Sequence, residues 1–100
     1  MTSDSMTQPA RDGIAIGVDT HRDTHTAVAL DALGGRLGER VIPTSPGGYH
    51  DLERWARSLG TVRAFGVEGT GSHGAGLSRH LRGAGFSVVE VDRPDRSARH

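Results

Sequence analysis

Five short runs of apolar or alternating residues, each bounded by glycine or polar residues, predict the strands of an α/β domain. They cover residues 14–18, 24–31, 36–42, 64–68 and 87–91. The first run is apolar or small throughout, as in a strand that is buried on both faces. The second and third runs alternate in polarity and are joined by Gly34-Gly35, a pair typical of hairpins. We therefore expect the first three strands to form an antiparallel meander.

Two segments between the later strands carry helical signals. In the first segment, Ser45 is suited to be the N-cap, Pro46 occupies the first helical position, and Gly60 ends the helix. Its apolar stripe consists of Tyr49, Leu52, Trp55, Ala56 and Leu59. Side chains at this spacing lie on one side of a helix, so we assign them, the aromatic ones included, to core packing.

The second helix is expected to start near Ser72 and to end at Gly85. Its inward positions would be Leu77, Leu81 and Ala84, and its outward positions Arg79, His80 and Arg82. The element order is then βββ-α-β-α-β. Right-handed crossovers would set the later strands parallel to the first, which predicts a mixed sheet.

Two acidic residues mark the ends of two predicted strands. Asp19 follows the run 14–18 and Glu68 ends the run 64–68, and turn-forming polar residues come after each. If these strands are parallel neighbours, they lie about 4.8 Å apart, and both carboxylates can reach one divalent ion that relieves their mutual repulsion. By side-chain parity each carboxylate shares its face with small residues, which leaves room for an ion and a substrate backbone. The alternative is that a polar residue simply ends each strand, and the residues alone leave both interpretations open.

Length and composition narrow the class of protein. The 100 residues suffice for one small domain, which we expect over residues 13–92, after a disordered lead at 1–12 and before a basic tail at 93–100 that leads to a missing remainder. Cysteine is absent, which excludes disulfide frameworks and thiolate metal sites and agrees with a reducing compartment. No apolar stretch could span a membrane and the start lacks the features of a signal peptide, so a cytoplasmic protein is expected.

Charge is balanced overall but uneven along the chain. The formal net charge is zero, and all 12 Lys-or-Arg positions are arginine. Arg93, Arg96 and Arg99 cluster near the end, and the planar guanidinium fork suits phosphate. These three arginines are candidates for nucleic-acid contacts, with a solvated tail as the alternative.

Two further patterns could indicate a binding site, a phosphate loop and a histidine metal site, but the residues favour a structural role for each. The glycine-rich segment 69–76 could bring backbone amides to a phosphate at a helix N-terminus. No lysine follows as in a Walker loop, so a tight strand-to-helix turn is the better interpretation. His21 and His25 are spaced to share one face of a helix, but they flank a turn that enters a strand, which argues against a histidine metal site.

Three segments occur in a distinctive order. Residues 17–25 read Gly-Val-Asp-Thr-His-Arg-Asp-Thr-His, residues 65–72 read Phe-Gly-Val-Glu-Gly-Thr-Gly-Ser, and residues 89–96 read Val-Glu-Val-Asp-Arg-Pro-Asp-Arg. Together they resemble the amino-terminal domain of the insertion-sequence-110 transposases, and the similarity extends over about residues 13–96. Those enzymes are similar to the Holliday-junction resolvase RuvC and use an Asp-Glu-Asp-Asp metal site on a ribonuclease-H-like fold. The resemblance implies that Asp19 and Glu68 are the first two acidic ligands, for Mg²⁺ or Mn²⁺ in the complete enzyme.

The sequence also departs from that family. By the resemblance, the last two aspartates lie beyond the Arg-Pro-Asp-Arg segment on a closing helix, and a further domain carries a serine implicated in strand transfer. Asp92 and Asp95 have a similar spacing but align before that pair, and the sequence ends at His100. We therefore expect a truncated DNA transposase that is inactive alone. For the complete, nucleoid-associated bacterial enzyme the resemblance implies DNA, a guide RNA and further copies of the same chain as partners.

Two rival functions stay open. Actin-like ATP-binding phosphotransferases share the ribonuclease-H-like fold and also place an Asp after a Gly in their first phosphate hairpin. Their second phosphate loop and adenosine segment are absent from this sequence. The other rival is a non-catalytic remnant that only binds nucleic acid or a partner transposase.

Overall fold

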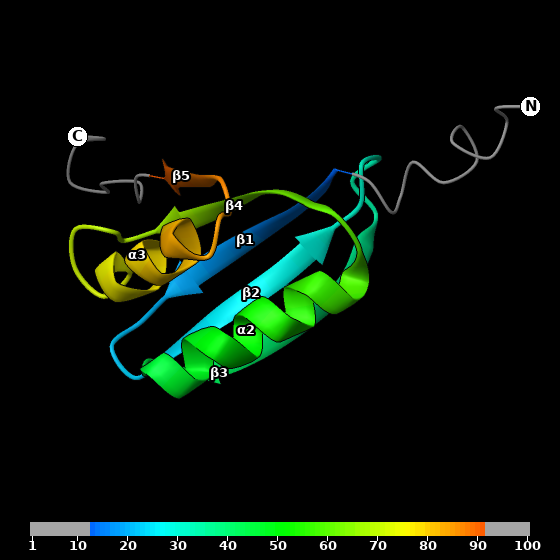
Figure 1. Cartoon of the computed structure of the whole chain (residues 1–100). Coiled ribbons are helices and arrows are strands. Elements are labelled where there is room, and N and C mark those ends of the chain that lie inside the picture. The colour runs from blue at the N-terminus through cyan, green and yellow to red at the C-terminus, as the bar shows by residue number, and fades with distance from the viewer. Residues whose placement is uncertain (1–12, 92–100) are drawn as a thin grey trace, which may run out of the picture.

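The computed structural model describes residues 13–91, which form a sheet and two helices (Figure 1). The strands are β1 (Ile14–Thr20), β2 (Thr24–Leu30), β3 (Arg36–Pro43), β4 (Val62–Glu68) and β5 (Val88–Val91), and the helices are α2 (Pro46–Leu59) and α3 (Ala75–Gly83). Neither helix is long and apolar enough to cross a membrane. The expected lead at residues 1–12 and the expected basic tail, with Arg93, Arg96 and Arg99, lie outside the described residues.

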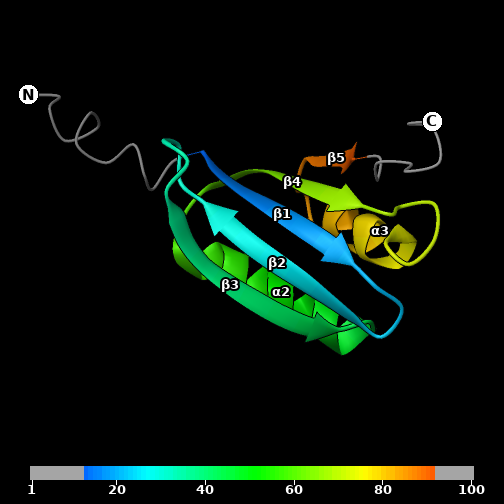
Figure 2. The same cartoon turned by 180° about the vertical axis from the view of Figure 1, so that it is seen from behind.

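The five strands form one mixed sheet in the order β3-β2-β1-β4-β5 (Figures 1 and 2). The first three are antiparallel neighbours, whereas β4 is parallel to β1 and β5 is parallel to β4. Asp31 closes the predicted hairpin between β2 and β3, because its carboxylate accepts hydrogen bonds from the backbone N–H groups of Leu33 and Gly35. This order and pairing confirm the α/β, ribonuclease-H-like fold with a meander followed by parallel β-α-β-α-β.

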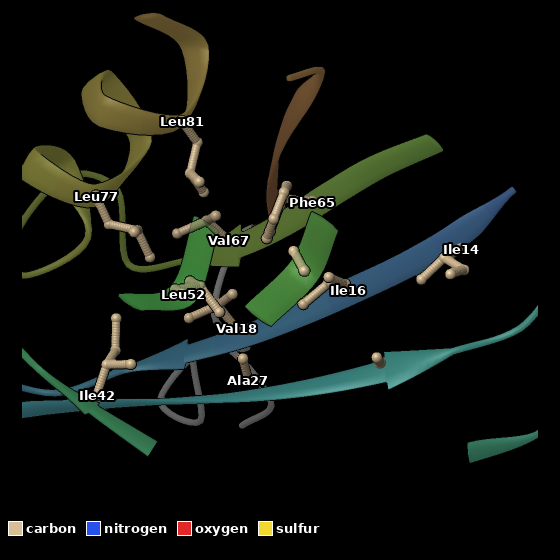
Figure 3. Close-up of a cluster of buried hydrophobic side chains, with 12 residues drawn as sticks. Ile14, Ile16, Val18, Ala27, Ile42, Leu52, Phe65, Val67, Leu77 and Leu81 are labelled. Atoms are coloured by element: carbon tan, nitrogen blue, oxygen red, sulfur yellow. The ribbon is translucent and has the colours of Figure 1, made fainter. Parts of the chain in front are cut away.

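Both helices cover the same face of the sheet, and the hydrophobic core lies between the two layers (Figures 2 and 3). The largest buried side chains come from the sheet and from each helix: Ile14, Ile16, Val18, Ile42, Leu52, Phe65, Val67, Leu77 and Leu81. Tyr49 and Trp55 are partly buried against this cluster, as their place on the apolar stripe predicts. Successive side chains in a strand point to opposite faces, so each strand supplies every second residue to this core.

No element of residues 13–91 covers the opposite face of the sheet (Figure 2). Five large apolar side chains are exposed there: Leu30, Leu37, Val41, Val89 and Val91. The expectation that the first strand is buried on both faces is therefore wrong, because Gly17 and Asp19 in β1 are exposed. The small residues at 15 and 17 made that run look uniformly apolar, although they bring little surface to bury.

Helix α2 begins and ends where the capping residues predict. The Ser45 side chain accepts a hydrogen bond from the Gly48 N–H at 3.2 Å, Pro46 lies in the first turn, and Gly60 follows the last turn. Helix α3 begins at Ala75 rather than near Ser72. The N–H groups of Ser72 and Gly74 both donate to the Gly69 carbonyl oxygen, at 3.0 and 2.9 Å, and so form a separate turn before the helix.

His80 on α3 was predicted to point outward, and this prediction is wrong. Its Nε2 lies 3.0 Å from Glu53 Oε1 of α2, and its side chain is largely buried. The helical pattern indicates which side of α3 faces the sheet. It does not indicate that α2 lies alongside and covers a flank of α3.

The first turn of α2 packs closely against the end of β3, and substitutions at two neighbouring glycines in that turn can test this contact. A Cβ added at Gly48 would lie 2.0 Å from the Pro43 carbonyl oxygen, whereas one added at Gly47 would meet only the Ser45 Oγ at 4.0 Å. We expect Gly48→Ala to lower the free energy of unfolding by about 1–3 kcal/mol through overpacking. Gly47→Ala should raise it by up to about 1 kcal/mol, because alanine is the better helix former. Urea unfolding followed by circular dichroism measures both, and equal effects would contradict this packing.

Candidate metal centre

Asp19 and Glu68 lie at the carboxyl ends of two adjacent parallel strands. In the pairing of β1 with β4, Gly17 lies opposite Gly66 and Val18 opposite Val67, so the two acidic residues come next on each strand. Figure 2 shows the ends of β1 and β4 side by side. Both carboxylate residues line one pocket of about 500 Å³. The structure therefore brings together the two residues that the sequence singled out.

Glycines leave the space in which this pocket lies. A Cβ added at Gly17 would meet no heavy atom within 4 Å, and one added at Gly66 would come to 3.4 Å from Val91 Cγ2. Both glycines line the pocket beside the carboxylate residues. The expectation that Asp19 and Glu68 share a face with small residues is thus confirmed, and an ion or a substrate backbone has room to approach.

Two threonines that the sequence reasoning did not single out as site residues help to build this edge of the sheet. Thr20, fully buried on the helix side, donates a hydrogen bond from its Oγ1 to the Glu68 carbonyl oxygen at 2.7 Å. This bond ties the end of β1 to the end of β4. Thr26 lies opposite Asp19 in the pairing of β1 with β2 and also lines the pocket. A polar residue at an inward strand position, as at Thr20, is the signal that could have pointed to the bond.

The two histidines near this edge differ in their surroundings. His21 is exposed in the turn after β1, whereas His25 is fully buried beneath α2, where its ring stacks on Tyr49 with the ring planes 4° apart. Burial lowers the pKa of His25, and the nearby His21 and His73 act in the same direction. The expected placement of His21 in a turn and of His25 in the strand that follows is thus confirmed.

The glycine-rich segment after β4 is a turn. Gly69 adopts a φ of +70°, which glycine tolerates, and its carbonyl oxygen accepts hydrogen bonds from Ser72 and Gly74. Those two amides are thus engaged within the loop, whereas a phosphate cradle needs amides that point at the anion. The preference for a tight strand-to-helix turn over a nucleotide loop is supported by this arrangement.

Comparison with protein families identifies the chain. Residues 16–99 match the model of the family DEDD_Tnp_IS110, which is described as a transposase. The chain belongs to this transposase family. The resemblance based on three short segments is thereby confirmed over most of the sequence. A search of curated proteins finds no match.

Solved structures with a similar fold include proteins from a bacterium and an archaeon. A Bacteroides thetaiotaomicron protein with an actin-like ATPase fold and unknown function has a TM-score of 0.59 at 15% identity, with 89% of this chain and 36% of that chain covered. Archaeoglobus fulgidus Pelota has a TM-score of 0.59 at 12% identity, with 93% and 30% covered. At such identities the likeness concerns the fold alone, and the transposase chain spans about a third of the length of these proteins.

The pocket glycine at 17 can be tested for a role in folding. Because a Cβ at this position meets open space, we expect Gly17→Ala to leave the free energy of unfolding unchanged or to raise it by up to about 1 kcal/mol. Gly85→Ala is the matched control that should be destabilising, because Gly85 has a φ of +96°. Urea unfolding measures both variants. A large loss of stability in Gly17→Ala would contradict the open pocket.

Buried His25 should make the domain sensitive to acid. Its pKa in the folded protein is below the ordinary value of 6.5, so the unfolded chain takes up the proton first as the pH falls. The contribution of His25 to stability is therefore complete above pH 6.5 and is lost as the pH falls from there toward the folded pKa, by at most about 1.4 kcal/mol per pH unit. We expect His25→Phe to remove this part of the pH dependence, whereas the exposed control His21→Gln should retain most of it, because burial is the largest cause of the shift. Unfolding at pH values on both sides of 6.5 measures the difference.

Proposed function

We propose that this domain supplies half of the metal site of a DNA transposase, with Asp19 and Glu68 as the first two acidic ligands. The observation that carries the proposal is their position at the ends of adjacent parallel strands, on one glycine-lined pocket. In open α/β sheets, ligands bind at the carboxyl ends of the parallel strands. Membership of the DEDD transposase family supports a role for these carboxylates in DNA transposition.

The donor set suits a hard divalent cation. Two carboxylates offer only oxygen atoms, the ligands that Mg²⁺ and Mn²⁺ prefer. When bound, such an ion polarises a phosphodiester and lowers the pKa of an attacking hydroxyl. Asp19 and Glu68 would hold it, and the space over Gly17 and Gly66 would admit the nucleic-acid backbone.

The proposal extends to the complete enzyme. Two further carboxylates, a closing helix and a carboxy-terminal domain with a serine would complete the reaction centre. Two carboxylates by themselves do not hold reacting groups in the geometry that in-line displacement requires. We therefore expect the 100-residue chain to bind Mg²⁺ weakly and to cleave no DNA. DNA as substrate, a guide RNA and a homo-oligomer belong to the same proposal, as do phosphate contacts of Arg93, Arg96 and Arg99.

The rival functions have less support. An actin-like ATPase needs amides that face the nucleotide phosphates, and in the loop after β4 the amides of Ser72 and Gly74 are bonded to Gly69. The actin-like neighbour is 15% identical to this chain, and a likeness at that level shows a shared fold but no shared activity. A non-catalytic remnant would not require two carboxylates at one pocket, although nucleic-acid binding by such a remnant is compatible with the same surface.

The test uses the transposase extended through its closing helix and carboxy-terminal domain. We expect Asp19→Asn and Glu68→Gln each to reduce Mg²⁺-dependent strand cleavage by at least about a hundredfold while leaving the fold intact, because each keeps the shape of the side chain and removes its charge. Cleavage of labelled DNA and circular dichroism measure the two effects.

The matched control is Glu39→Gln. Glu39 is a carboxylate on the same face of the sheet, opposite Val28 in the pairing of β2 with β3, but it does not line the pocket. Its replacement should leave cleavage at the level of the unsubstituted enzyme. If the Asp19→Asn, Glu68→Gln double variant still cut DNA at that level, neither residue would be a metal ligand and the proposed mechanism would be wrong.

A further inference from the structure

Three metal-ligating side chains gather where α2 and α3 meet. His50 and Glu53 lie one helical turn apart on α2 and so share a face of that helix, and His80 comes from α3. One ligand atom from each residue lies within 4.8 Å of the other two. Both helices cover the face of the sheet opposite the Asp19–Glu68 pocket (Figure 2). The cluster is therefore separate from the proposed transposase centre.

The distances within the cluster are close to those of a coordinated ion. Glu53 Oε1 lies 3.0 Å from His80 Nε2 and 4.0 Å from His50 Nδ1. Ligand atoms on a tetrahedral ion with bonds near 2.1 Å are about 3.4 Å apart. The rings of His50 and His80 meet edge to face, with centroids 4.8 Å apart. The exposed His50 side chain would have to move closer to Glu53 to bind the same ion.

The other oxygen of Glu53 is already held. Glu53 Oε2 accepts hydrogen bonds from Arg57 Nε at 3.3 Å and Nη2 at 3.2 Å. Arg57 is itself fixed, because it donates to the Ala84 carbonyl oxygen and lies 4.5 Å over the Phe86 ring. Partners of this kind orient the carboxylates and imidazoles of metal sites. Arg57 thus turns Oε1 of Glu53 toward the two histidines.

The donor set selects the type of ion. Two imidazole nitrogens and one carboxylate oxygen suit Zn²⁺ and similar transition metals, whereas Mg²⁺ prefers oxygen ligands alone. We propose that His50, Glu53 and His80 bind one Zn²⁺ ion that links α2 to α3, with water at the fourth position. Without the ion, the Glu53–His80 hydrogen bond still links the two helices.

The first experiment is a zinc titration of the untagged, chelator-treated chain in excess Mg²⁺, which occupies oxygen-only sites. We expect one Zn²⁺ per chain by calorimetry and an increase in melting temperature on saturation. Substitution by Co²⁺ should produce the visible absorption of a four-coordinate site with nitrogen and oxygen ligands. A titration without a one-to-one binding site would overturn the proposal.

Variants assign the ligands. His50→Gln is the primary variant, because the His50 side chain is exposed and its loss should leave the fold intact. We expect this variant and His80→Gln each to weaken Zn²⁺ binding by at least about tenfold and to abolish the increase in melting temperature. The matched control is His73→Gln, a histidine exposed in the loop before α3, which should bind Zn²⁺ as the unsubstituted chain does.

Two outcomes contradict the assignment. Unchanged affinity in His50→Gln would remove it from the ligand set, and loss of binding in His73→Gln would place the ion elsewhere. The Asp19→Asn variant should bind Zn²⁺ normally, since Asp19 lies on the other face of the sheet. Zinc affinity therefore tests this site independently of the proposed transposase centre.

Discussion

The parallel pairing of β1 with β4 is the constraint on which the arrangement of the candidate site depends. Side chains alternate along a strand, so a slip of one residue would turn an entire strand over. With Gly17 opposite Gly66, the inward residues of both strands fill the core and the outward ones reach the same pocket. Thr20 adds a hydrogen bond to the Glu68 carbonyl oxygen at the end of the pairing. Burial of the apolar residues and placement of the carboxylates are thus two results of one register.

The two faces of the sheet have different roles, since one packs against the core and the other carries the candidate site. One face carries both helices and the fully buried core, whereas the other carries the pocket and exposed apolar side chains such as Val41 and Val89. Glycines at 17 and 66 contribute no side chain to packing, and glycine within a strand generally weakens it. Their position on the pocket face leaves space for a ligand, at the expense of some stability of the strands.

The two proposed ion sites differ in the way that coordination chemistry would require. The pocket offers the carboxylates of Asp19 and Glu68 from strands, and the helix cluster offers two imidazoles with the Glu53 carboxylate. A hard cation such as Mg²⁺ would therefore bind at the pocket, and a transition metal such as Zn²⁺ would bind at the helix cluster. The polar contacts of the helix cluster also account for part of the packing of α2 against α3, because Arg57 reaches from α2 to the Ala84 carbonyl oxygen after α3.

Local signals in the sequence were sufficient for most of the fold. Ser45 and Gly60 bound a helix through backbone groups that lie next to them in the chain, and Gly34 permits the hairpin turn through its own φ of +88°. Asp19 and Glu68 could be found in the same way, because each directly follows or ends an apolar run. The parallel placement of their strands then followed from the handedness of crossovers. These features depend on neighbours in sequence or on a general chirality.

Only the tertiary structure decided what covers each surface. The periodicity of apolar residues in the sequence indicates which side of a helix or strand is buried, but it does not identify the element that packs against that side. For this reason the exposure of one face of β1 differs from expectation. His80 meets Glu53 across 27 residues of sequence, and no local pattern relates the two. The apolar pattern and the capping residues of the sequence thus determined the elements, their order and the two acidic strand ends, whereas the contact between α2 and α3 arose from packing between distant segments.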